Sequence, residues 1–200
     1  RLFESNLTTL GRTFGISHRL LTVLPLAAMH YAIRAKLTTP REDVAHWEQT
    51  LARVYLYAPA LLLALLIRFE LGRVATVVGW AALSLVLLVL GLRHRNTDLR
   101  WQSYLLAGAT FVRSWTTNFY VPESLAGMPL RIGTAAVVIV AFFTAELLAR
   151  RLGNDTPYED ASSQPNILRL IDRHSRDLFS LLGTLLLAVL LYHEVSGSYL

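Results

Sequence analysis

Six long apolar runs constrain the fold of this chain more than any other feature of its sequence. Segments such as LLLALLI and AAVVIVAFF are continuously apolar instead of alternating with polar residues, so they indicate buried helices and not half-buried strands. A helix that crosses a bilayer needs about 20 residues, most of them apolar. The sequence therefore predicts an all-α polytopic transmembrane helix bundle of about six spans, over residues 20–33, 54–67, 74–92, 101–121, 132–149 and 178–192.

The composition agrees with a membrane protein and excludes other classes of protein. The chain is 54% hydrophobic and 16% charged, whereas soluble domains are roughly 25% charged. The apolar content excludes an intrinsically disordered chain, and the absence of cysteine excludes disulfide staples and cysteine-ligated metals. The net charge is +5, but the basic residues lie at the ends of the apolar runs, so nucleic acid is not an expected partner.

The predicted spans are not equally apolar. Residues 74–92 and 132–149 reach span length by themselves, whereas the first, second and sixth runs need flanking amphipathic residues. Arg113 and Asn118 interrupt the fourth run, which would either cross fully or be re-entrant. Residues 1–18 are predicted to be a juxtamembrane segment, in which 2–10 would form a short interfacial helix or the end of an upstream domain.

The basic residues predict an orientation. If all six runs cross, one side of the membrane holds 12 of the basic residues and the other side holds 6, with Arg113 left inside the fourth run. Because cytoplasmic loops carry the excess of positive charge, the loops 34–53, 93–100 and 150–176 are predicted to be cytoplasmic. The arginine-rich composition indicates a bacterial genome, and the predicted location is the inner (cytoplasmic) membrane of a bacterium.

A second pattern indicates an internal repeat. The loop sequence TPRED at 39–43 recurs as TPYED at 156–160, and LLLALLIRFELG from Leu61 recurs as LLLAVLLYHEVSG from Leu185. These matches predict a parallel duplication with a first unit of four spans (19–121) and a partial second unit of two spans (122–200). Spans that match the third and fourth would then follow residue 200.

The repeated T-P-x-E-D loop has two interpretations. Thr followed by Pro and two acids is typical of a helix start, where the hydroxyl caps the helix and the carboxylates face the positive end of the dipole. The alternative is a cation or substrate site formed by Glu42, Asp43, Glu159 and Asp160, although no metal-ligand spacing accompanies these residues.

Five polar residues inside or at the ends of the predicted spans are candidates for function, because burying such groups in a bilayer is costly. Arg113 would pair with Glu146, bind a lipid phosphate, line a polar pathway together with Asn118, or simply snorkel or pack inside the bundle. Glu70 and Glu194 recur at equivalent ends of the second and sixth runs, where each would mark the membrane interface.

Two histidines are candidate cofactor ligands. His30 and His193 would ligate haem or chlorophyll from a helix, because neutral imidazole is a good axial ligand. At the repeat offsets Leu147 replaces His30 and Phe69 replaces His193, so no cofactor pair recurs. No metal is predicted, and no hydrolase or phosphate-binding signature occurs in the sequence.

The pattern LLLAVLLYHEVSGSYL, with the basic-flanked leucine-rich spans around it, resembles a group of large bacterial membrane proteins of unknown function that contain many tandem spans. The resemblance covers residues 54–92 and 178–200 and implies fold and membrane location, with no catalytic motif to carry over. The function expected is a non-catalytic scaffold or accessory subunit of a larger membrane complex, respiratory, photosynthetic or similar, with the lipid bilayer and other membrane subunits as partners. The alternatives are a transporter or lipid-handling permease with a polar site around Arg113, and a membrane enzyme acting on lipid-linked substrates.

Overall fold

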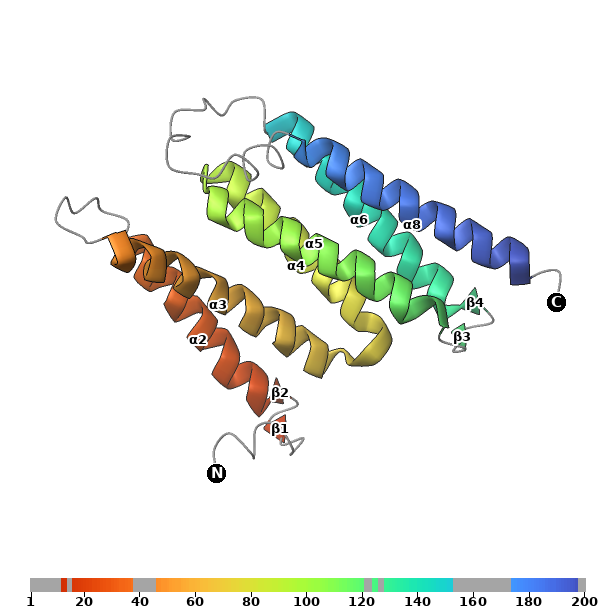
Figure 1. Cartoon of the computed structure of the whole chain (residues 1–200). Coiled ribbons are helices and arrows are strands. Elements are labelled where there is room, and N and C mark those ends of the chain that lie inside the picture. Colours follow the sequence, from red (N-terminus) through yellow and green to blue (C-terminus); the bar gives the residue numbers. More distant parts are fainter. Residues whose placement is uncertain are drawn as a thin grey trace. The chain divides into compact units, whose positions relative to one another are not determined.

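Helices make up nearly all of the structure, a computed structural model that describes residues 12–13, 16–37, 46–120, 124–125, 128–152 and 174–197 (Figure 1). Within these residues six α-helices occur: α2 (His18–Leu37), α3 (His46–Glu70), α4 (Gly72–Arg93), α5 (Thr97–Thr116), α6 (Leu130–Leu152) and α8 (Ser175–Gly197). Five of the predicted apolar runs lie within one of these helices each, and the fourth run overlaps α5. The prediction of a helical fold is therefore confirmed for the described residues.

Three of the described helices are long and apolar enough to cross a membrane. These are the segments Val74–Arg93, Leu130–Leu152 and Asp177–Val195 in α4, α6 and α8. The helices α2, α3 and α5 contain 20, 25 and 20 residues, which at about 1.5 Å per residue gives at least about 30 Å each. They have the length of a span but carry more polar residues.

The fourth predicted run ends earlier than expected. The run was predicted over residues 101–121, whereas α5 ends at Thr116 and is followed by the 3₁₀ turn η1 (Asn118–Tyr120). Thr117 leaves the helical region of backbone space at φ −122° and ψ −48°. The Thr117 backbone N–H still donates to the Arg113 carbonyl at 3.0 Å, whereas the next residue, Asn118, bonds through its side chain to Thr134 of α6.

Two very short strand pairs occur that the sequence pattern does not predict. The strands β1 (Arg12–Thr13) and β2 (Ile16–Ser17) pair antiparallel, as do β3 (Ser124–Leu125) and β4 (Met128–Pro129). Each pair directly precedes a helix, α2 in the first case and α6 in the second. The T-P-x-E-D loops and residues 1–11 lie outside the described residues.

The chain divides into two compact units, Arg1–Gly72 and Arg73–Leu200. In the first unit α2 and α3 pack against each other in antiparallel directions, because the residue before α2 contacts the last residue of α3 and the two helices also meet at mid-length through His30 and Tyr55. This division describes packing, whereas the predicted boundary between residues 121 and 122 describes a sequence duplication.

In the second unit α4 and α5 are joined by a tight turn. Arg95 adopts the left-handed conformation with φ +52°. The Asn96 side chain caps α5 by accepting hydrogen bonds from the backbone N–H groups of Asp98 and Leu99. The Asn96 backbone N–H in turn donates to the Gly91 carbonyl at 2.8 Å. This hydrogen bond holds the start of α5 against the end of α4.

The helices α6 and α8 pack closely along their lengths (Figure 1). Phe142 of α6 and both Phe179 and Leu186 of α8 are almost completely buried. Gly183 of α8 faces Phe142 and Phe143, so a side chain there would lie 3.3 Å from the Phe143 ring. This small residue allows the two backbones to approach.

Several polar side chains in this unit are buried and bond to nearby backbone carbonyls. Ser84 of α4 and Ser103 of α5 each donate to the other's backbone carbonyl, at 3.0 and 2.8 Å. The buried hydroxyls of Thr110 and Ser114 donate to the carbonyls four residues earlier in α5. Hydroxyls that bond in this way can be buried without an external partner.

Candidate functional site

Polar side chains from several elements contact one another at the end of the second unit where α5 ends, α6 begins and α8 ends. Antiparallel packing of α6 and α8 brings the first turn of α6 next to the last turn of α8, and η1 lies beside both. We call the polar and aromatic residues of this region the joint cluster; they are Asn118, Phe119, Tyr120, Arg131, Thr134, His193 and Glu194.

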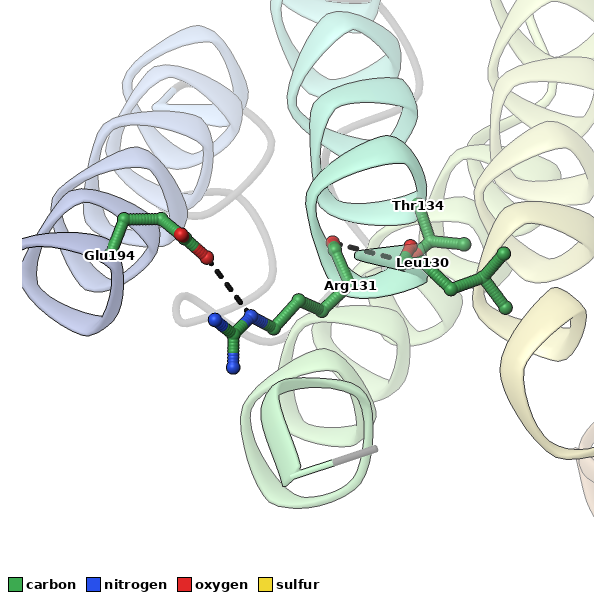
Figure 2. Close-up of polar contacts among 4 residues, drawn as sticks. All are labelled: Leu130, Arg131, Thr134 and Glu194. Atoms are coloured by element: carbon green, nitrogen blue, oxygen red, sulfur yellow. Dashed lines mark hydrogen bonds and ion pairs between the residues drawn. The ribbon is translucent and has the colours of Figure 1, made fainter. Parts of the chain in front are cut away.

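Asn118 links η1 to α6. Its side chain is buried, with 2% of its surface exposed, and its Nδ2 donates to Thr134 Oγ1 at 2.7 Å. The Thr134 hydroxyl is oriented as an acceptor for this bond because its own proton goes to the Leu130 carbonyl at 2.8 Å (Figure 2). Asn118 Oδ1 is buried and accepts no hydrogen bond from the described residues, which makes it the unsatisfied acceptor of the cluster.

Arg131 links α6 to α8. Its Nε donates to Glu194 Oε1 at 2.9 Å, and Figure 2 shows this nitrogen facing the carboxylate. The side chains of Arg131 and Glu194 are 29% and 35% exposed. Solvent screens such a pair, so its contribution to stability is about 0.2–1 kcal/mol.

This ion pair is expected to show a small favourable coupling energy in a double-mutant cycle of Arg131→Gln and Glu194→Gln. The expected coupling is about 0.2–1 kcal/mol, measured by unfolding the purified chain in mixed detergent micelles. The matched control is the pair of Glu146 and Arg150 within α6, whose arginine is 62% exposed and whose coupling should be at the low end, about 0.3 kcal/mol. A coupling of zero between Arg131 and Glu194 contradicts a stabilising contact between α6 and α8 through this pair.

His193 contributes an aromatic contact to the joint cluster. Its ring stacks on Phe119 with centroids 5.2 Å apart and planes 6° from parallel, and its edge faces Tyr120 at 5.9 Å. The imidazole therefore packs α8 against η1. A cofactor ligated by His193, as the sequence pattern allows, would have to fit beside this stack.

The structure separates Arg113 from Glu146. The Arg113 guanidinium lies over the Trp80 ring of α4 at 5.4 Å, whereas Glu146 pairs with Arg150 on its own helix. Thr134, which contacts Asn118, precedes Glu146 by twelve residues in α6, which corresponds to about 18 Å along the helix. Asn118 and Glu146 therefore do not belong to one site.

The first unit contains a related but simpler contact. The hydroxyl of Ser17, just before α2, donates to Glu70 at the end of α3. Arg19, in the first turn of α2, lies over the Phe69 ring at 5.3 Å. Glu70 thus ties the end of one helix to the start of its neighbour, as Glu194 does in the second unit.

His30 lies at mid-length in the first unit. Its ring stacks on Tyr55 with centroids 4.7 Å apart, and Nδ1 is 2.7 Å from the Leu26 carbonyl oxygen. Because a carbonyl oxygen only accepts, Nδ1 carries the proton, and Nε2 is the nitrogen that would ligate a haem or chlorophyll. Among the described residues no group of three or more His, Asp or Glu side chains is arranged to hold a metal ion.

Neither the polar residues within the predicted spans nor the repeats at offsets of 117 and 124 point to Arg131, Thr134 and Phe119. A further offset contains the signal. At 112 residues, Gly15, Arg19 and Thr22 recur as Gly127, Arg131 and Thr134, and Arg1 and Asn6 recur as Arg113 and Asn118.

Comparisons of the chain with protein-family models, with curated proteins and with solved structures find no match. Function is therefore inferred from the geometry of the described residues.

Proposed function

We propose that the chain is a polytopic integral membrane protein that serves as a scaffold or accessory subunit of a larger membrane complex in the inner membrane of a bacterium, with no catalytic activity of its own. The observation that carries the proposal is the distribution of polarity in the second unit. The polar side chains of Ser84, Ser103, Thr110 and Ser114 are buried, whereas large apolar side chains are exposed along α4, α6 and α8.

The exposed apolar surface is too extensive for a helix bundle in water. Val86 of α4, Val140 of α6 and Leu191 of α8 are 52%, 64% and 57% exposed, and similar residues line the other helices. A surface of this kind is stable against lipid or against other membrane subunits. The buried Ser84–Ser103 contact is the type of polar contact that holds helices together where lipid removes the hydrophobic driving force.

The proposed architecture has six spans and a parallel repeat. In both units a two-residue strand pair precedes a helix whose second residue is arginine, and a glutamate near the end of the following helix contacts the start of the first. The hydroxyls of Thr22 and Thr134 make the same two bonds, to the carbonyls three and four residues earlier. These likenesses support duplication and the proposed relationship to bacterial proteins with tandem spans.

The proposed topology has the loops 34–53, 93–100 and 150–176 in the cytoplasm. Within the second unit α4 ends, α5 begins, α6 ends and α8 begins on one side, and these ends carry Arg93, Arg95, Arg100, Arg150 and Arg151. The opposite ends carry Arg73, in the first turn of α4, and Arg131, which is paired with Glu194. This asymmetry supports the assignment because positive charge accumulates on the cytoplasmic side.

Assembly tests the subunit proposal. The full chain, tagged and extracted from its native membrane in a mild detergent, is expected to elute with other membrane polypeptides at fixed stoichiometry, measured by native mass spectrometry. Recovery of the chain alone at all detergent concentrations contradicts the proposal.

A transporter or lipid-handling permease is the second candidate, and the buried polar residues Thr110 and Ser114 of α5 and Asn118 of η1 favour it. The internal bonds of the two hydroxyls oppose it, because groups satisfied in this way do not need a solute or water.

Arg113→Leu separates the two candidates. The scaffold proposal predicts that this variant assembles normally and complements a deletion strain fully, with a stability loss of about 0.5–2 kcal/mol from the lost contact with Trp80. Val112→Leu, an exposed neighbour, is the matched control. An Arg113→Leu protein that assembles like the control but fails to complement contradicts the scaffold proposal and supports the permease.

A further inference from the structure

We propose that the end of the second unit at which α8 begins binds the phosphate group of an anionic phospholipid. This inference rests on the proposed insertion in a membrane. It concerns the basic end, which we define by the exposed or half-buried arginines Arg93, Arg95, Arg100, Arg150 and Arg151.

The packing brings these arginines to one level although they come from segments about fifty residues apart. Gly91 of α4 contacts Arg100 of α5. The Tyr104 ring of α5 contacts the Phe179 ring of α8 at 5.8 Å, and Gly183 of α8, one turn further along, contacts Phe143 of α6. The helix ends lie one to two turns beyond these contacts. At that level Arg100 of α5 and Arg150 of α6 lie on either side of the start of α8.

The start of α8 adds to the attraction for an anion. The first N–H groups of a 23-residue helix carry the positive end of its dipole and are donors for phosphate oxygens. Because α8 packs on both α5 and α6, its first turn lies between the arginines of the two helices. Asp177 in that turn opposes anion binding, and among the side chains that the structure describes at this end five arginines face three carboxylates, those of Asp98, Glu146 and Asp177.

A buried donor at the same level lacks an acceptor. Trp101 is 9% exposed, and its Nε1–H is buried without a hydrogen-bond partner among the described residues. Its ring contacts Tyr104, which contacts Phe179, so the indole belongs to the region beside the first turns of α8. Leaving such a donor unpaired costs about 1–3 kcal/mol, and a phosphate oxygen would be a suitable acceptor.

The surroundings favour a lipid over a free phosphate ion. One turn deeper than the arginines, Leu105 of α5, Leu147 of α6 and Leu181 of α8 are exposed. A ligand with an anionic head and acyl chains matches arginines at a helix end followed by exposed leucines. Basic sites between helices on the cytoplasmic side are suited to anionic headgroups.

Short-chain lipids test the site on the full chain in nonionic detergent. Dioctanoyl phosphatidylglycerol is expected to bind at least about 10-fold more tightly than dioctanoyl phosphatidylcholine, by isothermal titration calorimetry, because each arginine near the surface adds about 1 kcal/mol. Arg93→Gln/Arg150→Gln should remove most of this preference. The control Arg19→Gln/Arg68→Gln removes the same charge from α2 and α3 and should change affinity less than about 2-fold. Trp101→Phe keeps the ring contact with Tyr104, removes only the N–H, and should weaken binding by about 3- to 10-fold.

Any of four results overturns the proposal. Three of them are equal affinity for the two lipids, an Arg93→Gln/Arg150→Gln protein that behaves like the control, and unchanged binding in Trp101→Phe. The fourth is displacement of the lipid by inorganic phosphate at equal concentration, which would assign the site to free phosphate. Alkaline carbonate extraction of native membranes separates this failure from failure of the proposed function. If the chain stays in the membrane but shows no lipid preference, only the proposed lipid site is contradicted. If the chain is released, the proposed membrane function is contradicted as well.

Discussion

Replacing Gly91 by alanine is expected to lower the free energy of unfolding by about 1–2 kcal/mol, although alanine is the better helix former. A Cβ atom at this position would lie 2.9 Å from the Arg100 backbone nitrogen and 3.2 Å from the Asn96 carbonyl oxygen. Backbone atoms cannot move aside as a side chain can, so the turn between α4 and α5 must open. Overpacking of this kind costs about 1–3 kcal/mol, which exceeds the gain of up to about 1 kcal/mol in helix propensity.

Gly108→Ala is the matched control for this prediction. Gly108 also lies inside a helix, α5, but nothing is within 4 Å of the position of its Cβ. This variant should be neutral or more stable by up to about 1 kcal/mol. Thermal unfolding in detergent, followed by circular dichroism, measures both. If Gly91→Ala unfolds at the same temperature as Gly108→Ala, the close contact of Gly91 with the backbone of Asn96 and Arg100 is contradicted.

Replacing Val140 by arginine is expected to prevent α6 from crossing the membrane. Val140 is 64% exposed and lies near the middle of α6 (Leu130–Leu152), where a lipid-facing side chain would be deepest in the bilayer. Exchanging valine for arginine at the centre of a span costs about 3 kcal/mol, or more than about 100-fold in the insertion equilibrium. In water the same exchange at an exposed site would change stability by less than about 0.5 kcal/mol.

A reporter at the C-terminus measures this effect. With six crossings both ends of the chain face the exterior, so an alkaline phosphatase fused after Leu200 is active; with α6 uninserted, the fusion moves to the cytoplasm and loses activity. Leu152→Arg, at the end of the same helix and also exposed, is the control and should retain activity because arginine there reaches the headgroups. Equal activity for both variants contradicts a lipid-facing α6.

The helices could be predicted from the sequence because continuous apolar runs signal them directly. The run 132–149 corresponds to α6, whose bounds differ from it by two and three residues. The end of the run 101–121 was predicted less well, because apolar and aromatic residues continue past Thr116 and hide the place where local hydrogen bonds stop the helix. The strand pairs are too short, at two residues each, for a periodicity to reveal them.

The candidate site could be predicted only in part. Glu194 was identified by its recurrence as Glu70, but its partner Arg131 was counted only as a flanking charge, since nothing local in the sequence links residues 63 positions apart. Pairing Arg113 with Glu146 was considered because both are charged residues in apolar runs. The structure instead puts Arg113 over Trp80 and Glu146 with Arg150, because helix register separates the two along the bundle.

Single-cysteine labelling tests membrane insertion most directly, and the chain is suited to it because it contains no cysteine. Tyr120→Cys, His94→Cys and Val140→Cys place one thiol each on η1, on the turn between α4 and α5, and on the exposed face of α6. In spheroplasts a membrane-impermeant maleimide is expected to label Tyr120→Cys at once, His94→Cys only after the membrane is opened, and Val140→Cys only after denaturation. Rapid labelling of all three in intact spheroplasts, or of Val140→Cys as fast as His94→Cys in opened membranes, would contradict the account.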